Sequence, residues 1–269
     1  MVAALEPAFA NHSLDMKVID WEAPLGSFDG IDLVLLGTAW NYQDKDTEFL
    51  AKLDELRARG ITVCNDPDLV LWNSSKTYLR ELEEAGARII PTLWHADVSR
   101  AELDEAFYYF GCEKLVVKRQ IGAGALGQEL IDKDDLPAED WRFGHAAMLQ
   151  PFLPAIAEEG ELSFIFIDGE LSHTLRKSAA DGEYRIQSMY GGTETVYEPS
   201  ADETDEATAI LDSLPFDTPL YARIDMLRSE RGALLLMEAE MIEPYLYPEQ
   251  GPQLGERLAQ GIEKRLKQQ

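Results

Sequence analysis

Short apolar segments alternate with helical patterns through the first third of the chain, and this alternation constrains the fold more than any other feature. Residues 16–21 (Met-Lys-Val-Ile-Asp-Trp) and 31–36 (Ile-Asp-Leu-Val-Leu-Leu) have the length and composition of strands. Apolar residues at helical spacing follow over 47–59, and 61–64 has the pattern of a third strand. Because strands separated by helices usually pair in parallel, we predict a small parallel α/β unit over residues 1–68.

The pattern changes after that unit. We predict a central lid subdomain over residues 69–148 and a C-terminal core built mainly of strands over residues 149–269. Ser99 and Glu102 form a capping-box pattern at the start of a helix over 99–110. Strands that follow one another without crossover helices pair antiparallel, so the predicted class is α/β followed by two α+β subdomains. Further strands are expected at 88–90, 114–118, 128–131, 147–152, 162–167, 171–175, 184–187, 220–225 and 234–240, and further helices at 78–85, 202–214 and 254–266.

The charge balance restricts the partners. The chain has 50 Asp and Glu against 24 Lys and Arg, a formal net charge of −26. Such a surface repels phosphate backbones and anionic lipid, so we expect no nucleic-acid and no membrane partner. Two separated cysteines and four scattered histidines exclude a disulfide scaffold and a closely spaced zinc site. No apolar run approaches the roughly 20 residues of a bilayer span, and no signal-peptide pattern opens the chain, so a cytoplasmic protein is expected.

A glycine run follows the strand expected at 114–118. Gly122, Gly124 and Gly127 have the Gly-x-Gly-x-x-Gly spacing of a dinucleotide site, but that site needs the run to open a helix, and here a strand follows. A strand–glycine loop–strand hairpin is instead typical of a flap whose amides bind phosphate oxygens. A plain flexible turn is the alternative interpretation. Lys118 on the entering strand favours the phosphate flap.

Three acidic residues lie on two expected strands near the end of the chain. Asp225 ends one strand, and Glu238 and Glu240 share a face of the next because strand positions two apart point the same way. Burying neighbouring carboxylates costs several kcal/mol, of the order of a few per charge, unless cations meet them. Magnesium takes oxygen ligands and is often shared between carboxylates and phosphates. The alternative is an edge strand with both glutamates in solvent.

The segment 181–192 offers the local cations that an acidic protein needs to bind an anion. Arg185 falls on an expected strand, and Gly191-Gly192 allows backbone amides to approach a ligand. Arg176 and Lys177 lie just upstream. A surface salt bridge followed by a hairpin turn is the alternative.

Taken in order, these features resemble the ATP-grasp superfamily, over about residues 30 to 250. The chain is most similar to its glutathione-synthetase-like and ribosomal-protein-glutamate-ligase-like branch. Segments 222–225 (Ala-Arg-Ile-Asp) and 240–244 (Glu-Met-Ile-Glu-Pro) further resemble the subgroup that contains the cyclo-ligase of cycloserine biosynthesis. The ordered set that carries the resemblance is Lys76, Lys118 with the glycine run, Gln150-Pro151-Phe152-Leu153-Pro154, Arg185 with Gly191-Gly192, Asp225, and Glu238-x-Glu240.

The resemblance implies a role for each motif in binding ATP and magnesium. Two lysines would hold the phosphates under the glycine loop, a hinge segment would bind adenine, and one acid would contact the ribose. Arg185 with the amides of Gly191 and Gly192 would stabilise the transferring phosphoryl group. The residues would be assigned as follows: Lys76 and Lys118 to the phosphates; Lys177 to a basic position on the strand that faces the same ATP site; Gln150, Phe152 and Leu153 to adenine; Glu161 to the ribose; Asp225, Glu238 and Glu240 to one or two magnesium ions.

The function implied is an ATP-dependent ligase that joins a carboxylate to an amine through an acyl phosphate. Its partners would be small-molecule or peptide carboxylates and amines, and it could form a homodimer. Thr38, Trp40 and Tyr42 are candidate substrate contacts. Two departures, Glu240 where the family often has asparagine and a chain that begins inside the first helix, favour an alternative: an inactive ATP-binding regulatory or partner module. A nicotinamide-dependent oxidoreductase is the third possibility.

Overall fold

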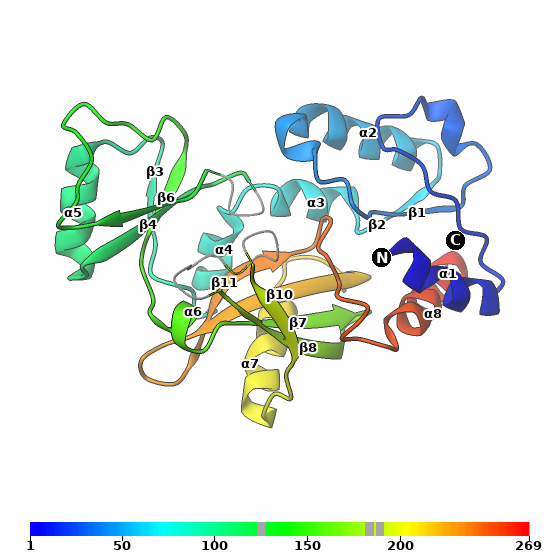
Figure 1. The fold of residues 1–269 in the computed structure, drawn as a ribbon. Coiled ribbons are helices and arrows are strands. Elements are labelled where there is room, and N and C mark those ends of the chain that lie inside the picture. The colour runs from blue at the N-terminus through cyan, green and yellow to red at the C-terminus, as the bar shows by residue number, and fades with distance from the viewer. Residues whose placement is uncertain (123–126, 181–185, 187–190, 269) are drawn as a thin grey trace.

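Three separate β-sheets organise the molecule. The structure is a computed structural model that describes residues 1–122, 127–180, 186 and 191–268. The sheets contain two, four and five strands, in the orders β1-β2, β3-β6-β4-β5 and β11-β10-β7-β8-β9. Figure 1 shows the two-stranded sheet and the four-stranded sheet at opposite ends, with the five-stranded sheet between and below them.

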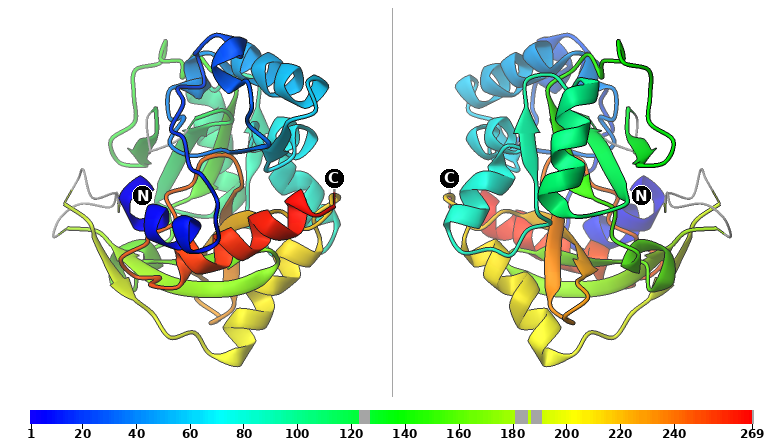
Figure 2. Two further views of the ribbon diagram at one scale, coloured as in Figure 1. Left: turned by 90° about the vertical axis from the view of Figure 1, so that its right-hand side faces the viewer. Right: turned by 90° about the vertical axis from the view of Figure 1, so that its left-hand side faces the viewer.

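The two-stranded sheet is parallel, as the sequence predicts. β1 (Leu33–Leu35) pairs with β2 (Thr62–Cys64). α2 (Asp46–Ala58) lies on one side of this sheet, and α1 (Val2–Asn11) and α8 (Leu254–Leu266) lie on the other (Figures 1 and 2). Their apolar faces bury Phe9, Phe49 and Leu258 in a common core that reaches the five-stranded sheet.

The prediction of a strand over 16–21 is wrong. Residues 14–20 have no regular structure, although they keep the apolar composition of a strand. A strand exists only where a ladder partner is present. In the described part of the chain, β1 pairs with β2 alone, and no strand lies between β1 and residues 16–21 to join them.

The four-stranded sheet is antiparallel and carries one helix. Its strands are β3 (Leu93–His95), β4 (Lys114–Arg119), β5 (Glu129–Asp132) and β6 (Ala147–Pro151). α5 (Arg100–Phe110) packs on it through Leu103, Ala106 and Phe107. The predicted capping box at the start of α5 is confirmed: the Ser99 hydroxyl accepts from the backbone, and the Glu102 carboxylate accepts from the Ser99 N–H at 2.8 Å.

The five-stranded sheet is also antiparallel and has an apolar core on the side of α4 and α7. Tyr78 and Leu79 of one helix and Ile210 of another pack against its strands, which places helices on the same apolar core as the sheet. α7 lies below the sheet in Figure 1. The elements are α3 (Pro67–Asn73), α4 (Tyr78–Glu84), α6 (Ala155–Glu158), β7 (Glu161–Ile167), β8 (Glu170–Ser178), β9 (Thr193–Val196), α7 (Ala201–Asp212), β10 (Tyr221–Arg228) and β11 (Leu234–Glu240), with short 3-10 helices at Leu25–Phe28 and Tyr42–Asp44.

Most other predicted elements are present within a few residues of their expected bounds. The strand expected at 88–90 is reduced to an isolated parallel bridge between Ile89 and Leu236. The strand expected at 184–187 lies largely outside the described residues. None of the helices in the described ranges is long and apolar enough to cross a bilayer.

Candidate functional site

Two lysines lie beside the glycine run. Lys118 is on β4, and Lys76 lies two residues before the start of α4. The Lys76 ammonium donates to the Gly122 carbonyl at 2.7 Å and pairs with Glu238 of β11 at 2.5 Å. Burial alone lowers the pKa of Lys76, but the negative charge of Glu238 outweighs it and raises the pKa above the ordinary value. This lysine therefore links the loop of the four-stranded sheet to the acidic strand of the five-stranded sheet.

Lys118 is the more exceptional cation. Burial lowers the pKa of Lys118, the charge of Glu238 opposes this, and the charge of Lys76 adds to the lowering. Within the described part of the chain, no carboxylate lies within ion-pair distance of its ammonium. A partly buried ammonium without a counterion is costly unless an anion arrives. Its position beside the glycine run suits a phosphate.

The structure describes the two ends of the glycine run, Gly122 and Gly127. Gly127 has φ +68°, in the left-handed region, and a Cβ there would lie 2.6 Å from Cδ of Arg119. The backbone conformation favours glycine at this position, and a larger residue would in addition displace the Arg119 side chain. Gly122 supplies the carbonyl that Lys76 binds. Gly124 lies outside the described residues.

The three acids assigned to magnesium come from adjacent strands. Asp225 of β10 lies directly opposite Glu238 of β11, and Arg223 lies opposite Glu240. Asp225 is 2% exposed, and the side chains of Glu238 and Glu240 are 24% and 28% exposed. The three acids thus lie on one face of the β10–β11 ladder. Asp225 is buried, whereas Glu238 and Glu240 lie closer to the surface.

Arg223 holds two of these acids together. Its guanidinium donates to both oxygens of Asp225, at 3.0 and 3.1 Å, and also pairs with Glu240. Burial opposes ionisation of Asp225, but Arg223 and Lys177 outweigh it and hold the pKa near 2. Burial raises the pKa of Glu240 to about 7, although Arg223 opposes that rise. The arginine, two positions before Asp225 on the same strand face, was not assigned from the sequence, and that spacing is the signal that could have identified it.

The carboxylate oxygens of the three acids suit a magnesium ion that is also coordinated by phosphate oxygens. In the described ranges, no group of three or more His, Cys, Asp or Glu side chains is gathered closely enough to form a complete metal cage. Magnesium usually takes one or two carboxylates, substrate phosphates and water rather than such a cage. Asp225, Glu238 and Glu240 offer only oxygen donors, and each is already neutralised by a cation. The donor chemistry therefore suits magnesium brought with a nucleotide.

Lys177 and Glu161 form a buried pair at the same face. The Lys177 ammonium lies 2.6 Å from Glu161 and 3.3 Å from Asp225, and all three side chains are at most 6% exposed. Burial and the charge of Asp225 raise the pKa of Glu161 to about 7. Ser163 donates to Asp225 at 2.5 Å and completes the cluster. In this arrangement Glu161 is engaged by Lys177, and a ribose contact for it stays a prediction.

The expected adenine hinge lies where β6 ends. Gln150 is 2% exposed, and its side-chain amide donates to the Thr92 hydroxyl at 2.8 Å. The Phe152 N–H donates to the Lys114 carbonyl at 2.9 Å, which fixes the exit of the chain from the sheet. Leu153 follows, partly buried, before α6. The hinge role of these residues stays a prediction.

The segment assigned to the transferring phosphoryl group is described only in part. Arg185 lies outside the described residues, and its role stays a prediction. Gly191 and Gly192 begin the described segment that leads into β9, with φ +85° at Gly191.

The N-terminal unit reaches the site through a segment after β1. The Trp40 indole N–H donates to the Glu243 carbonyl at 3.3 Å, and the Gln43 side chain donates to the Glu243 carboxylate at 3.3 Å. Burial and the charges of Glu240 and Glu238 raise the pKa of Glu243 to about 8. Glu243 was not selected from the sequence, because only the tertiary structure brings it next to this segment.

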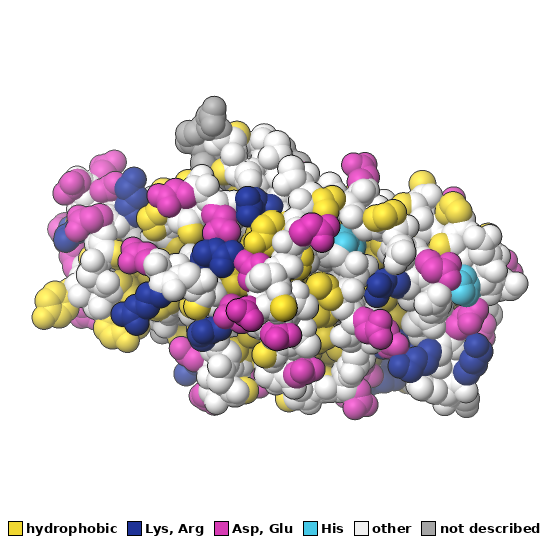
Figure 3. Space-filling view, turned by 90° about the horizontal axis from the view of Figure 1, so that it is seen from below, with side chains coloured by type: hydrophobic (Ala, Val, Ile, Leu, Met, Phe, Trp, Pro, Cys, Tyr) yellow, Lys and Arg dark blue, Asp and Glu magenta, His cyan; other side chains and the backbone are white. Residues whose placement is uncertain are grey.

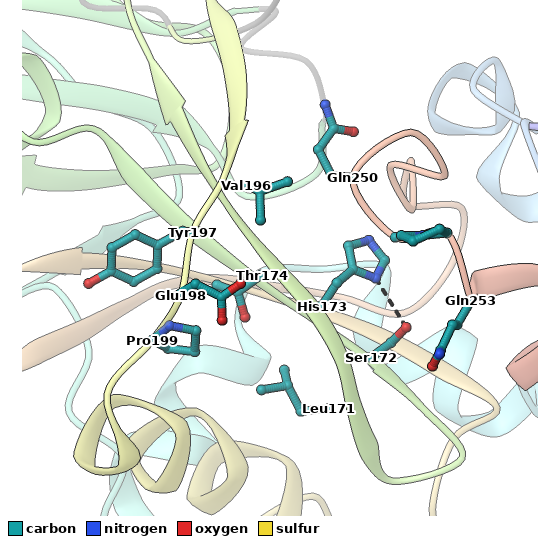
Figure 4. A pocket seen from close by; sticks show the side chains of 12 residues that line it. Leu171, Ser172, His173, Thr174, Val196, Tyr197, Glu198, Pro199, Gln250 and Gln253 are labelled. Atoms are coloured by element: carbon teal, nitrogen blue, oxygen red, sulfur yellow. Dashed lines mark hydrogen bonds between the residues drawn. The ribbon is translucent and has the colours of Figure 1, made fainter.

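Neither of the two cavities described next contains the predicted ATP residues. A pocket of about 320 Å³ lies beside β8 and β9, where His173 contacts Ser172 at 3.0 Å (Figure 4). A larger groove of about 1300 Å³ lies between the N-terminal unit and residues near the C-terminal end of the chain, among them Leu258 and Ile262 of α8. Figure 3 shows acidic and basic side chains interspersed over one face of the molecule, without a broad basic patch. The cations that could hold an anion are thus the buried ones beside the glycine run.

Comparisons with known sequences agree with the geometry. Residues 2–65 match the family model described as the N-terminal domain of D-cycloserine synthetase DcsG. The cycloserine biosynthesis protein DcsG of Streptomyces lavendulae is 27% identical over 274 residues, which cover 93% of this chain and 89% of that protein. A probable alpha-L-glutamate ligase of Xanthomonas campestris pv. campestris (strain 8004) is 26% identical over 189 residues, covering 69% of this chain and 64% of that protein.

Comparisons with solved structures show the fold. The crystal structure of D-cycloserine synthetase DcsG superposes with a TM-score of 0.84 at 22% identity, covering 98% of this chain and 94% of that one. D-alanine–D-alanine ligase from Bacillus anthracis, complexed with ATP, superposes with a TM-score of 0.66 at 16% identity, covering 99% and 92%. This chain therefore has the overall fold of these proteins over nearly its whole length.

Proposed function

We propose that this chain, an ATP-grasp protein of the ATP-dependent carboxylate–amine ligase class, activates a small carboxylate as an acyl phosphate with magnesium and ATP bound at the site above. The observation that carries the assignment is the pair of Lys76 and Lys118 at the glycine run, with one ammonium unpaired among the described residues. In a chain of net charge −26, a buried cation without a counterion is expected where an anion binds.

The reaction needs neutralisation of charge more than it needs a protein nucleophile. A carboxylate oxygen attacks the γ-phosphorus of ATP, the bond to the bridging oxygen breaks, and ADP leaves. The amine lone pair then attacks the acyl carbon, phosphate leaves with the former carboxylate oxygen, and the nitrogen loses one proton to the departing phosphate. Both steps gather negative charge at one place, and Lys76, Lys118 and Lys177 are the described cations positioned to stabilise it.

Magnesium would supply further neutralisation of the phosphates when bound. Asp225 and Glu238, opposite each other on β10 and β11, are the residues we assign to hold it, with Glu240 beside them. Arg223 keeps Asp225 ionised and oriented in this arrangement. Gly191, Gly192 and Arg185 are assigned to the phosphoryl group on sequence grounds alone.

Amino-acid-derived small molecules are the substrate class we propose. The matched relatives are named for cycloserine synthesis and for ligation of glutamate, and a structural neighbour is named for joining two D-alanines. The segment with Trp40 and Gln43 brings the N-terminal unit against Glu243, so the acceptor would lie between this unit and the acidic ladder.

The test is chemical trapping of the activated carboxylate. The protein is incubated with ATP, magnesium chloride, a panel of amino acids and hydroxylamine, and the hydroxamate and ADP are measured. An acyl phosphate gives equal amounts of both, and Lys118→Met should abolish both. Lys133→Met, at an exposed lysine after β5, is the matched control and should retain them. Tight ATP binding with neither product across the panel would overturn the ligase assignment in favour of an inactive nucleotide-binding module.

A further inference from the structure

A small pocket lies at the edge of the five-stranded sheet that ends in β9. Its volume is about 320 Å³, within the range of about 300–1,000 Å³ that small-molecule sites usually occupy. Its walls are β8, the segment that follows β9, and the segment that leads into α8 (Figure 4). None of the residues assigned above to ATP or magnesium lines this pocket, and all of its lining residues belong to the described part of the chain.

The pocket opens because the chain turns away from β8 after β9. The Tyr197 N–H still donates to the Thr174 carbonyl at 2.9 Å. Two residues later, Pro199 has no N–H with which to continue the ladder, and Ser200 caps the start of α7. The segment after β9 therefore diverges from the first half of β8, and the pocket lies between them.

The third wall approaches β8 closely. A Cβ at Gly251 would lie 2.2 Å from the His173 ring, so glycine permits this approach. The His173 Nε2 lies 3.0 Å from the Leu246 carbonyl, which can only accept, so Nε2 carries the proton. Burial lowers the pKa of His173, and the neutral ring accepts at Nδ1 from the Ser172 hydroxyl at 3.0 Å. The ring therefore adds no charge to the pocket, and the Ser172 oxygen keeps lone pairs for a ligand.

Thr174 contributes a hydroxyl that has no partner. Its residue is 3% exposed, and within the described ranges its Oγ1 makes no hydrogen bond. Figure 4 shows the Thr174 side chain in the part of the pocket that Glu198 and Pro199 also line. A buried hydroxyl without a partner costs free energy, so on a pocket wall it is expected where a ligand supplies the missing bond.

Glu198 gives the pocket its charge. No lysine or arginine lines the pocket, and no ion pair in the described part of the chain includes Glu198. Arg176, whose guanidinium lies 4.8 Å from the centre of the Tyr197 ring, pairs instead with Glu159 at 3.6 Å. A ligand that complements this pocket electrostatically is therefore a cation.

The rest of the lining is apolar or carries neutral amides. Leu171, Val196 and two prolines line the pocket, and Val196 is 59% exposed, so an aliphatic group would cover it. Gln253 is the N-cap residue of α8 but makes no capping bond through its side chain. Its amide is therefore available to a ligand.

We propose that this pocket binds a small primary amine that also carries a hydroxyl group and a short aliphatic group. The ammonium lies at Glu198, the hydroxyl bonds to Thr174, and the aliphatic group covers Val196. Because Thr174 and Glu198 line the same part of the pocket, an amino alcohol with its two polar groups on neighbouring carbons matches them. The inference does not depend on the ligase reaction.

Binding is tested with leucinol, which has an ammonium, a hydroxyl and an isobutyl group. The full chain is labelled at its leucine and valine methyl groups and titrated at pH 7 with each enantiomer. With at least one enantiomer, the methyl signals of Leu171 and Val196 should shift and saturate, whereas those of Leu103 and Val117 in the core of the four-stranded sheet should not. Absence of a saturable shift at Leu171 and Val196 would overturn the proposal.

A neutral analogue tests recognition of the charge. N-acetyl-leucinol should bind about threefold to fivefold more weakly than leucinol, the range of a partly exposed ion pair. Glu198→Gln should weaken leucinol binding by the same factor and leave N-acetyl-leucinol unaffected. Glu230→Gln, at an exposed glutamate in the turn between β10 and β11, is the matched control and should change neither. Equal binding of the two compounds, or equal effects of the two variants, would overturn recognition of an amine.

Thr174→Val separates a ligand-binding hydroxyl from a structural one. The substitution removes the unpartnered hydroxyl at nearly constant shape, so it should raise the melting temperature of the free protein and weaken leucinol binding about threefold. Thr208→Val, where the hydroxyl already donates to the Thr204 carbonyl at 2.8 Å, is the control and should leave leucinol binding unchanged. Unchanged leucinol binding by Thr174→Val would overturn the assignment of this hydroxyl to a ligand.

Discussion

A single buried asparagine joins the N-terminal unit to the five-stranded sheet, and its replacement tests that junction. Asn65 follows β2 and is 2% exposed. Its amide nitrogen donates to the carbonyls of Tyr221 at 2.9 Å and Met241 at 2.7 Å. Its carbonyl oxygen accepts from the Leu220 N–H at 2.8 Å. These bonds span more than 150 positions of sequence, so they couple segments that no local interaction connects.

The cost of Asn65→Leu follows from the three backbone groups that it would leave unpaired. Each unsatisfied buried group costs about 1–3 kcal/mol, so the sum over three groups is about 3–9 kcal/mol. A domain is stable by only about 5–15 kcal/mol, so the loss is large relative to the whole. The added apolar volume offsets little of it, because the carbonyls stay out of water.

Urea denaturation followed by tryptophan fluorescence measures the loss. Asn11→Leu, at an exposed residue that ends α1, is the control and should change stability by less than about 0.5 kcal/mol. A loss below about 1 kcal/mol for Asn65→Leu would refute the reasoning, because water or rearrangement would then be satisfying the three groups.

Asn65→Asp separates hydrogen bonding from shape. A carboxylate at this position would face two carbonyl oxygens, and burial would raise its pKa in the folded state above that in the unfolded state. The folded variant then binds more protons than the unfolded one, so its deficit relative to the wild type is smallest below about pH 4 and grows as the pH rises. A deficit independent of pH between about 4 and 8 would contradict this.

The other predictions concern the site and the N-terminal helix. Lys118→Met should raise the Kd for ATP at least tenfold, measured by calorimetry, whereas Lys133→Met should not change it. Gly127→Ala should reduce ADP formation strongly, because the added methyl meets Arg119 at 2.6 Å and the backbone has φ +68°; unchanged turnover would show that the loop tolerates both. Hydrogen bonds to two glutamates of α8 raise the pKa of His12, so the stabilising contact between α1 and α8 is full below pH 6.5 and is lost as the pH rises through the raised pKa. His12→Gln should flatten this part of the pH dependence of the melting temperature, and an unaltered slope would contradict it.

Local patterns determined much of the architecture. Capping chemistry at Ser99 and the 3.6-residue period placed α5, and the period-two rule placed Glu238 and Glu240 on one face. Gly127 of the glycine run has a positive φ that favours glycine, a local requirement that the sequence displays directly. These features depend on interactions within a few residues, which a sequence displays directly.

Tertiary structure alone decided which partner each strand and charge receives. The apolar composition of residues 16–21 was correct for a strand, but a strand also needs a neighbour, and pairing is a non-local property. Likewise, the sequence contains Lys177, Glu161 and Arg223 as isolated charges, and only the antiparallel registers of β7, β8, β10 and β11 bring them to Asp225. The physical reason is that burial and Coulomb energy depend on distances in space. These distances are set jointly by segments that lie far apart in the sequence.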